Sequence, residues 1–516
     1  KRKDEVEDFM NKYQLSSVEN KILTGVSSEY DHIDDKFFAT LKKAHNIKKK
    51  CEQAIYSSQS PSAATTQIEI MEEMSMYMSS AYHRLSEWIE TKCKTMLVEQ
   101  ENGNQQKPIE DEIRKAVNAL QGHPTLLEIC FKELISVRKR FIHVNFFNAL
   151  KTHIDLQAID IHTYLSQIFA HVHIACASET EFVEALFGVY DPMNSQSRKI
   201  IEAIIEPLPH FISTRVADTY ESHEMKIREL FDASHMCELY RVKIHQVLQF
   251  ESALEICIKD LETQFINSFN EKLKAIKEEI TTFVCPEHEI KVLLITKESM
   301  EKFTNLMHLY HTSVVDSDRR DEDFNKVLSS IVLPLIKLFQ NDRSKALETV
   351  IVKETKDIER SNSTIAEFSF LVNNLNVIFT SLSQFAFCGD TADEVETLMN
   401  RYVEQLITTV TSRILFQCGF YQINNQELSL EKVKQFVEEF YEILFDATSE
   451  SNPLYLKELN DIDSNKWVKY IRSRTISEIS NAYRTLYDKA MKANLHPNMS
   501  EVLYHKPENI ALLIDV

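Results

Sequence analysis

Glycine is scarce in this chain, and the scarcity limits what the chain can fold into. Only 6 of its 516 residues are glycine and 11 are proline, whereas average usage would give about 36 and about 26. Because sheet proteins need both residues at their many tight turns, the composition argues against sandwiches, barrels and doubly wound α/β folds. Phosphate-binding loops need several neighbouring glycines. Here each glycine stands alone, at Gly25, Gly103, Gly122, Gly188, Gly389 and Gly419.

Apolar residues recur at spacings of three and four over long stretches of the sequence. Such spacings put them on one face of an α-helix, whereas the residues of a strand alternate between two faces. Sustained alternation is absent, and the single ambiguous run, at 290–295, is short. The pattern therefore predicts an all-α fold. The residues of the four clearest stripes are Met71, Met74, Met78, Ala81, Leu85 and Trp88; Leu254, Ile258, Leu261, Phe265, Phe269, Leu273, Ile276 and Ile280; Val433, Phe436, Val437, Phe440, Tyr441 and Leu444; and Trp467, Ile471, Ile479, Tyr483 and Leu486.

Several helix ends are also predicted from local sequence. A serine or threonine followed three residues later by glutamate fits the capping box, in which side chains satisfy free amides of the first turn. Gly389 stands where a left-handed residue is expected to end a helix. The capping pairs are Ser16 with Glu19, Thr364 with Glu367, and Thr391 with Glu394.

Polar, proline-containing or glycine-containing breaks divide the chain into five expected parts. The breaks lie at 57–67, 100–108, 188–194, 285–288, 316–323, 388–390 and 446–453. We expect an N-terminal helical segment over residues 1–56, followed by helical bundles over 68–187, 195–284, 289–388 and 390–516. The stripes show no tandem repeat, which disfavours a consensus solenoid. We therefore expect successive helical bundles joined end to end. Residue spacing alone does not distinguish a globular arrangement of these bundles from a rod.

The net charge of −20 limits the classes of molecule that the chain is expected to bind. The first 150 residues are nearly balanced, with 21 basic and 22 acidic side chains, so the acidic surplus lies almost wholly after them. A nucleic-acid-binding protein needs a clustered basic face. The only basic runs are 48–50 and 138–140, which we interpret as solvated helix faces rather than as patches for acidic partners or anionic lipid.

The 9 cysteines are scattered and contain no C-x-x-C pair. Such a set is typical of reduced thiols in a cytosolic protein, most of them small core residues. No uninterrupted apolar run approaches 18 residues, so the sequence predicts no membrane span, and it shows no signal peptide.

No residue pattern predicts a catalytic, cofactor-binding or metal-binding site. His171 and His173 point in different directions on a helix. His308 and His311 share a helix face, but spacing supplies no third metal ligand. Glu29 with His32 forms a single Glu-x-x-His pair, whereas a helical di-metal site needs two such pairs. The adjacent glutamates at 72–73, 278–279 and 438–439 are expected on solvated faces. The methionines at 71, 74, 76 and 78 suit an adaptable peptide groove, but bundle core is the favoured interpretation. Zinc-protease and nucleophile-elbow motifs are absent from the sequence.

Ordered blocks of the sequence carry a family resemblance. Near the N-terminus these are VEDFMNKYQLSSVENKI at 6–22, DKFFATL at 35–41, IEIMEEM at 68–74, and AYHRL at 81–85 with Trp88 after it. The middle and the end of the chain contribute HTSVV at 311–315, DF at 323–324, VLS at 327–329, LPL at 333–335, FLVNNL at 370–375 and VLYHKPENI at 502–510 with LL at 512–513. In this order the blocks resemble the family of subunit six of the conserved oligomeric Golgi complex.

The resemblance implies a non-enzymatic subunit of a multisubunit tether that captures retrograde vesicles at Golgi membranes and so maintains glycosylation enzymes. It implies an elongated rod of consecutive helical bundles, without a cofactor or metal. The implied partners are sister subunits of the complex, SNAREs and Rab GTPases, and the implied location is peripheral, on the cytosolic face of the Golgi. The family also carries an upstream coiled-coil segment, which we expect to be missing from this sequence.

Two other classes of protein stay open. A subunit of another helical-rod tether, such as exocyst, shares the expected fold but is not expected to contain the ordered blocks. A helical enzyme or metal-binding protein would need further ligands converging with His308 and His311.

Overall fold

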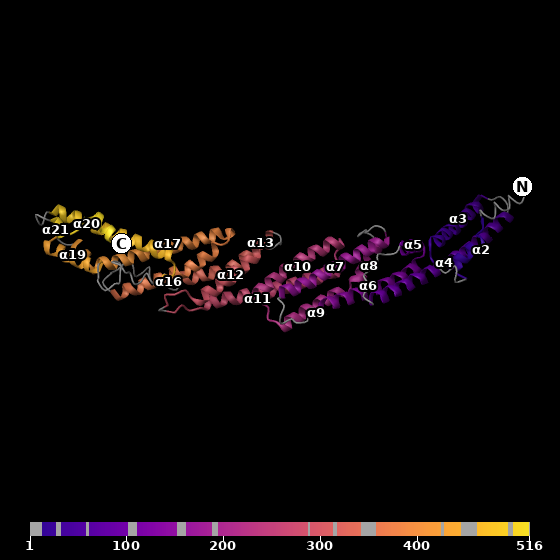
Figure 1. Ribbon diagram of the computed structural model, residues 1–516, viewed down its shortest axis with the longest axis horizontal. Helices are drawn as coiled ribbons and strands as arrows, with labels where there is room; N and C mark the ends of the chain where they lie inside the picture. Colours follow the sequence, from indigo (N-terminus) through magenta and orange to yellow (C-terminus); the bar gives the residue numbers. More distant parts are fainter. Residues whose placement is uncertain are drawn as a thin grey trace. The chain divides into compact units, whose positions relative to one another are not determined.

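The computed structural model describes most of the chain as helices (Figure 1). The described residues are 13–26, 32–57, 61–101, 111–151, 161–187, 195–286, 289–312, 317–341, 358–424, 428–444, 462–493 and 499–514. Within these ranges every regular element is helical, which confirms the all-α prediction. The helices are α2 (Ser17–Thr24), α3 (Asp35–Ser57), α4 (Pro61–Glu101), α5 (Asp111–Leu120), α6 (Pro124–Lys151), α7 (Ile161–Phe187), α8 (Ser195–Ile205), α9 (Pro207–Ser222), α10 (Ile227–Leu248), α11 (Ala253–Thr282), α12 (Leu294–Thr312), α13 (Ser317–Val327), η2 (Leu328–Val332), α14 (Leu333–Asn341), α16 (Ile358–Leu382), η3 (Ala386–Cys388), α17 (Gly389–Gln417), α18 (Phe420–Asn424), α19 (Leu430–Leu444), α20 (Asn465–Ala493), α21 (Met499–Val502) and α22 (Pro507–Ile514).

Contacts between Cα atoms divide the chain into two compact units, Lys1–Ile266 and Asn267–Val516. In the first unit α3 packs on α4, α4 packs on α6, and α7 packs on α10 (Figure 1). In the second unit α16 packs on α17 and α12, and α20 packs on α17 and α22. The finer division into an N-terminal segment and four bundles stays a prediction. The break expected at 57–67 is shorter than predicted, because α4 already begins at Pro61, and proline suits the first turn of a helix.

The apolar stripes become the cores of the two units. Every residue of the 254–280 stripe and of the 467–486 stripe is buried. On α4, Met74, Met78 and Leu85 are buried, but Trp88 is only half-buried and Ile89 takes its place in the core. A straight helix with 3.6 residues per turn drifts away from a strict 3-and-4 repeat, which accounts for the one-residue shift.

Only one of the three predicted capping boxes is present. Ser16 Oγ accepts a hydrogen bond from the amide of Glu19 at 3.2 Å, and the Glu19 carboxylate accepts one from the amide of Ser16 at 2.7 Å. The predictions for Thr364 and Thr391 were wrong, because α16 already begins at Ile358 and α17 at Gly389.

The prediction that Gly389 adopts a left-handed conformation at a helix end was also wrong. Its φ is −51°, in the right-handed helical region at the start of α17. The left-handed glycines that follow helix ends are Gly25 after α2, with φ at +67°, and Gly419 after α17, with φ at +74°.

Three asparagines on α16 hold two irregular segments of the second unit in place. The Asn374 side-chain oxygen accepts hydrogen bonds from the amide of Leu293 and the hydroxyl of Thr296, both at 3.0 Å. Asn373 accepts a bond from the amide of Asp463 at 3.0 Å and donates one to the carbonyl of Ile290 at 3.2 Å. Asn376 accepts one from the Trp467 indole at 3.2 Å. The ambiguous run at 290–295 is therefore a segment fastened to α16 that leads into α12.

Part of α16, Ser363–Leu382, is the one stretch of the described residues that is long and apolar enough to cross a membrane. Of its most apolar part, 61% is buried inside the protein, and its asparagines bond to neighbouring segments. Length and composition of this kind also occur in the core helix of a bundle, and the packing of α16 against α17 and α12 fits that role.

A buried ion pair joins α6 to α7 in the first unit. The Arg138 guanidinium donates to both oxygens of Glu179, at 2.7 and 2.5 Å, and lies over the rings of Phe141 and Phe182. Burial raises the pKa of Glu179, and the hydrogen bonds and charge of Arg138 partly offset the rise. The interpretation of 138–140 as a solvated face was therefore wrong for Arg138, whose exposed fraction is 4%.

We expect Glu179→Gln to lower the free energy of unfolding by about 3–5 kcal/mol, because it leaves the Arg138 charge buried without its partner. Replacing both residues, Arg138→Met with Glu179→Leu, should recover most of that loss. Urea titration measures both effects. The matched control is Glu202→Gln, which breaks the exposed Arg198–Glu202 pair and should cost less than about 0.5 kcal/mol. An equally small cost for Glu179→Gln would contradict the expectation.

The C-terminal block is expected to be part of the second core rather than an appendage. The buried Tyr483 hydroxyl donates to the carbonyls of Leu503 and His505, at 2.6 and 3.0 Å. Tyr483→Phe should therefore cost about 1–2 kcal/mol and lower the thermal midpoint. Tyr470→Phe on the same helix removes an exposed hydroxyl that donates to Glu404 and serves as the control, with a change within about 0.5 kcal/mol. Equal midpoints for the two variants would argue against a docked C-terminus.

Candidate functional site

The histidines singled out from the sequence do not form a metal site. Across the described ranges, no group of three or more His, Cys, Asp and Glu side chains is placed to hold an ion. His308 and His311 are exposed on α12, and the His308 ring lies 5.2 Å from the ring of Phe385. His173 packs against Tyr240, and burial followed by the charge of Lys243 lowers its pKa. Glu29 lies outside the described residues.

Most of the cysteines are core residues. All nine are free thiols, and seven of them are buried. Burial raises the pKa values of Cys93, Cys176 and Cys418 to about 12 and that of Cys388 to about 11. Since the thiolate is the nucleophile, these four side chains are unreactive near neutral pH.

The glutamate pairs and the methionines follow their expected structural roles only in part, since Glu73 and Glu439 are half-buried. Glu278 and Glu279 are exposed on α11. Met74 and Met78 are buried in the core beside α4, whereas Met76 points to solvent with an exposed fraction of 61%. The methionines therefore serve as core on one face and do not line a groove together.

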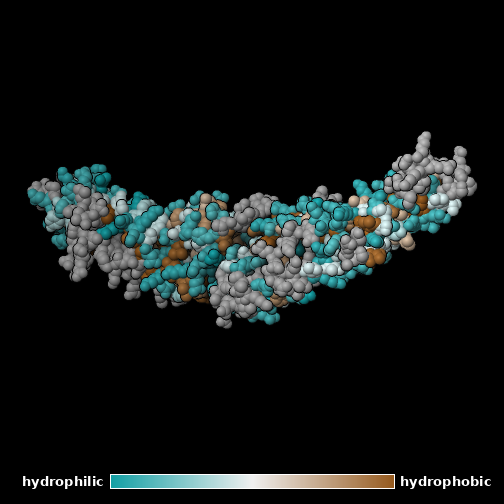
Figure 2. Space-filling model, turned by 45° about the vertical axis from the view of Figure 1, so that its right-hand side comes forward, coloured by the Kyte–Doolittle hydropathy of each residue, from teal (hydrophilic) through white to brown (hydrophobic). Residues whose placement is uncertain are grey.

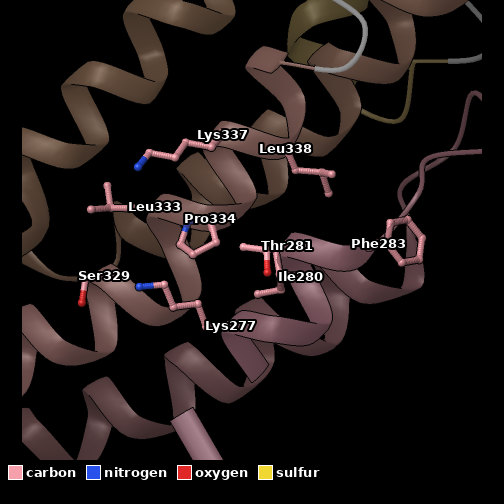
Figure 3. A pocket seen from close by; sticks show the side chains of 9 residues that line it. All are labelled: Lys277, Ile280, Thr281, Phe283, Ser329, Leu333, Pro334, Lys337 and Leu338. Carbon is pink, nitrogen blue, oxygen red and sulfur yellow. The ribbon is translucent and has the colours of Figure 1, made fainter. Parts of the chain in front are cut away.

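The second unit contains a pocket between the C-terminal end of α11 and the helices η2 and α14 (Figure 3). Its volume is about 390 Å³, within the lower range of small-ligand and side-chain pockets. We call it the α11–α14 pocket. Its lining residues are Lys277, Ile280, Thr281, Phe283, Ser329, Leu333, Pro334, Lys337 and Leu338.

Pro334 explains why regular helix packing is interrupted here. Proline has no amide hydrogen to donate to the carbonyl four residues earlier, and its ring crowds that carbonyl. Just before it, residues Leu328–Val332 widen into a π-helix, and the amide of Leu333 bonds to the carbonyl of Leu328, five residues back. Single π-turns inside helices frequently mark functional sites. Here the widened turn places Ser329 and Leu333 on the wall of the pocket.

Two lysines give the pocket its charge. Lys277 has no acidic residue three or four positions away along α11, and the same holds for Lys337 along α14. Among the side chains that the structure describes, no ion pair to either ammonium group is found. In the view of Figure 3 both ammonium groups extend toward the side where Leu333 and Ser329 lie. Phe283 and Leu338 lie on the other side.

Sequence reasoning missed this pocket, although the sequence held two indications of it. The apolar run at 331–336 contains a proline, which is unusual inside a helix. Of the blocks that carry the family resemblance, VLS and LPL supply Ser329, Leu333 and Pro334. The contribution of α11, more than 45 residues earlier, depends on tertiary packing and has no local pattern.

A family model for the C-terminal part of conserved oligomeric Golgi complex subunit 6 matches residues 64–514. Curated relatives with the same description align along nearly the whole chain. The relative from Arabidopsis thaliana is 20% identical and covers 100% of this chain and 82% of its own length. The human relative is 22% identical, with 98% and 76% covered. The relative from Drosophila melanogaster is 21% identical, with 98% and 78% covered.

Solved structures of the exocyst subunit Exo70p are similar in fold. One, described together with the C-terminal domains of Exo84p, has a TM-score of 0.58 and an identity of 12%, covering 99% of this chain and 98% of that one. Another, of the S. cerevisiae protein, has a TM-score of 0.56 and an identity of 13%, with 99% of each chain covered. At these identities the similarity concerns the fold alone, whereas the family match extends over most of the sequence. The chain belongs to the family of conserved oligomeric Golgi complex subunit 6.

Proposed function

We propose that this protein is a non-enzymatic subunit of the conserved oligomeric Golgi tethering complex. In that role it scaffolds the capture of retrograde vesicles at the Golgi and so maintains the glycosylation enzymes that those vesicles return. The observation that carries the proposal is the family match over 64–514 together with relatives aligned along the whole chain.

The arrangement of side chains supports a role without catalysis. Enzymes place titratable groups with strongly shifted pKa values together in a cleft. Here the thiols with the most strongly raised pKa values are core residues, and no lining residue of the α11–α14 pocket is a nucleophile paired with a described general base. Such a protein acts by binding and by holding its partners at a distance from one another.

The proposed partners are sister subunits, which would join through helix packing, together with SNAREs and Rab GTPases. The proposed location is peripheral, on the cytosolic face of Golgi membranes. The nine free cysteines support a reducing compartment. The helices bury their apolar faces and leave polar faces outside. Figure 2 shows hydrophilic residues over much of the coloured surface in view.

An exocyst subunit is the second candidate, because the fold resembles that of Exo70p. Affinity capture of the tagged full-length protein from cells distinguishes the two. We expect the subunits of the Golgi complex to co-purify with it in stoichiometric amounts. Co-purification of exocyst subunits in their place would contradict the proposal.

We expect cells that lack the protein to display underglycosylated surface proteins and reduced levels of sister subunits, because helices that bury apolar faces against a partner lose cover without it. Lectin binding and immunoblotting measure the two effects, and re-expression of the full-length protein should reverse both. Normal glycosylation in the null cells would overturn the tether assignment.

Variants separate a scaffold from an enzyme in the same cells. His308→Ala with His311→Ala, and Glu438→Gln with Glu439→Gln, should rescue glycosylation as well as the unchanged protein does. Leu85→Asp should fail, since it buries an uncompensated charge in the core of the first unit. Its control is His83→Asp, at an exposed position on the same helix. Loss of rescue by a folded histidine or glutamate variant would favour the enzyme alternative.

A further inference from the structure

The lining of the α11–α14 pocket is largely apolar and also carries two lysines. Ile280, Phe283 and Leu338 provide apolar side chains from α11, the segment that follows it, and α14. Lys277 and Lys337 provide positive charge, and in Figure 3 their ammonium groups extend in a common direction, away from Phe283 and Leu338. A ligand that fills such a pocket needs an apolar group and an anionic group held close together.

The two lysines stand out against the charge of the whole chain. Acidic residues outnumber basic ones by 78 to 58, and some described lysines pair with carboxylates, as Lys326 does with Glu322 at 2.8 Å. Lys277 and Lys337 come from different helices, and no described carboxylate pairs with either of them. Two cations at one pocket, neither of them paired with a described carboxylate, favour an anionic occupant, because an opposite charge nearby stabilises both.

The apolar side of the pocket continues onto exposed surface. Phe283 lines the pocket, and the next residue, Val284, has an exposed fraction of 82%. Together they give a partner an apolar surface next to the open pocket. This arrangement, an anchor pocket with adjoining contact area, is typical of helix-in-groove and peptide recognition.

We propose that the α11–α14 pocket binds a short segment of a partner protein in which a large apolar side chain lies one helical turn from a carboxylate. The apolar side chain enters between Ile280, Phe283 and Leu338, and the carboxylate pairs with Lys277 and Lys337. The proposal rests on the proposed function, since a scaffold subunit is where such a partner segment would dock.

The charges around the pocket favour a protein segment over a membrane surface. Binding to anionic lipid needs a broad cluster of basic residues, commonly about four to eight, and this pocket carries only two. The neighbouring Glu278 and Glu279 on α11 are exposed and acidic, so an extended anionic surface would be repelled there. A single carboxylate on a narrow segment meets the lysines without approaching a wide acidic area.

The test uses the purified full chain and a short fluorescein-labelled peptide that carries leucine and phenylalanine, each one turn from a glutamate. Fluorescence polarisation should give a Kd of about 1–100 μM, as expected for a small transient contact. Affinity should fall as NaCl is raised, because the ion pairs are partly exposed. Matched peptides, with lysine in place of glutamate or serine in place of the apolar residues, should not bind.

Variants place the binding in the pocket. Lys277→Glu with Lys337→Glu should weaken binding at least about tenfold, which is about 1.4 kcal/mol. Ser329→Phe should block the cavity from an exposed position. The control, Lys434→Glu with Lys469→Glu, makes the same change in net charge at exposed sites on α19 and α20 and should leave affinity unchanged. Thermal unfolding of each variant should match that of the parent chain.

Binding that is lost in both pocket variants and kept in the control supports the proposal. Absence of peptide binding, or equal binding by all variants, overturns it. Pocket-dependent binding of phosphatidylserine vesicles without peptide binding also overturns it, in favour of a membrane ligand. Glycosylation rescue is scored separately in the null cells. A failed peptide test with intact rescue therefore removes the pocket assignment and leaves the tether function standing.

Discussion

Burial of one apolar stripe per helix is the constraint on which the rest of this structure depends. Isolated helices are marginal in water, and most of their stability in proteins comes from packing an amphipathic face. The stripe at 254–280 illustrates this, since all eight of its residues are buried although charged residues surround them in the sequence. Because the chain has almost no glycine to make tight turns, its sequence favours long helices packed side by side in each unit.

Stripe burial alone does not select one packing arrangement over its neighbours, and buried polar groups supply the missing specificity. Sliding α6 against α7 by one turn would keep apolar contacts but separate Arg138 from Glu179, leaving both charges unpaired at high cost. The asparagines of α16 act similarly in the second unit, because Asn373 and Asn374 can satisfy their hydrogen bonds only when 290–296 and 463 lie in register. Full satisfaction of such networks favours a unique arrangement over shifted ones.

The sequence predicts elements better than it predicts partners, for physical reasons visible at particular residues. Periodicity placed Leu85 and Tyr483 in cores correctly, because stripe burial is a property of one helix. The basic run at 138–140 was misassigned at Arg138. Three adjacent basic residues are typical of a solvated helix face, and the partner that allows Arg138 to be buried, Glu179, lies on another helix, α7. The capping pattern succeeded at Ser16 and failed at Thr364 and Thr391, because the same residue pairs also fit helix interiors. The pocket could not be predicted from the sequence, since Lys277 and Lys337 come to line one pocket only through tertiary packing.

A scaffold subunit must present specific surfaces while its regular helices present mostly hydrophilic ones (Figure 2). Regular packing hides the large side chains that give interfaces their binding energy, so specific contacts are expected where regularity breaks. Pro334 causes one such break: it removes a helical hydrogen bond, the preceding turn widens, and a cavity opens toward α11. The family blocks VLS and LPL contain the residues of this break. A local backbone defect thereby becomes the place where we propose that this scaffold subunit recognises a partner.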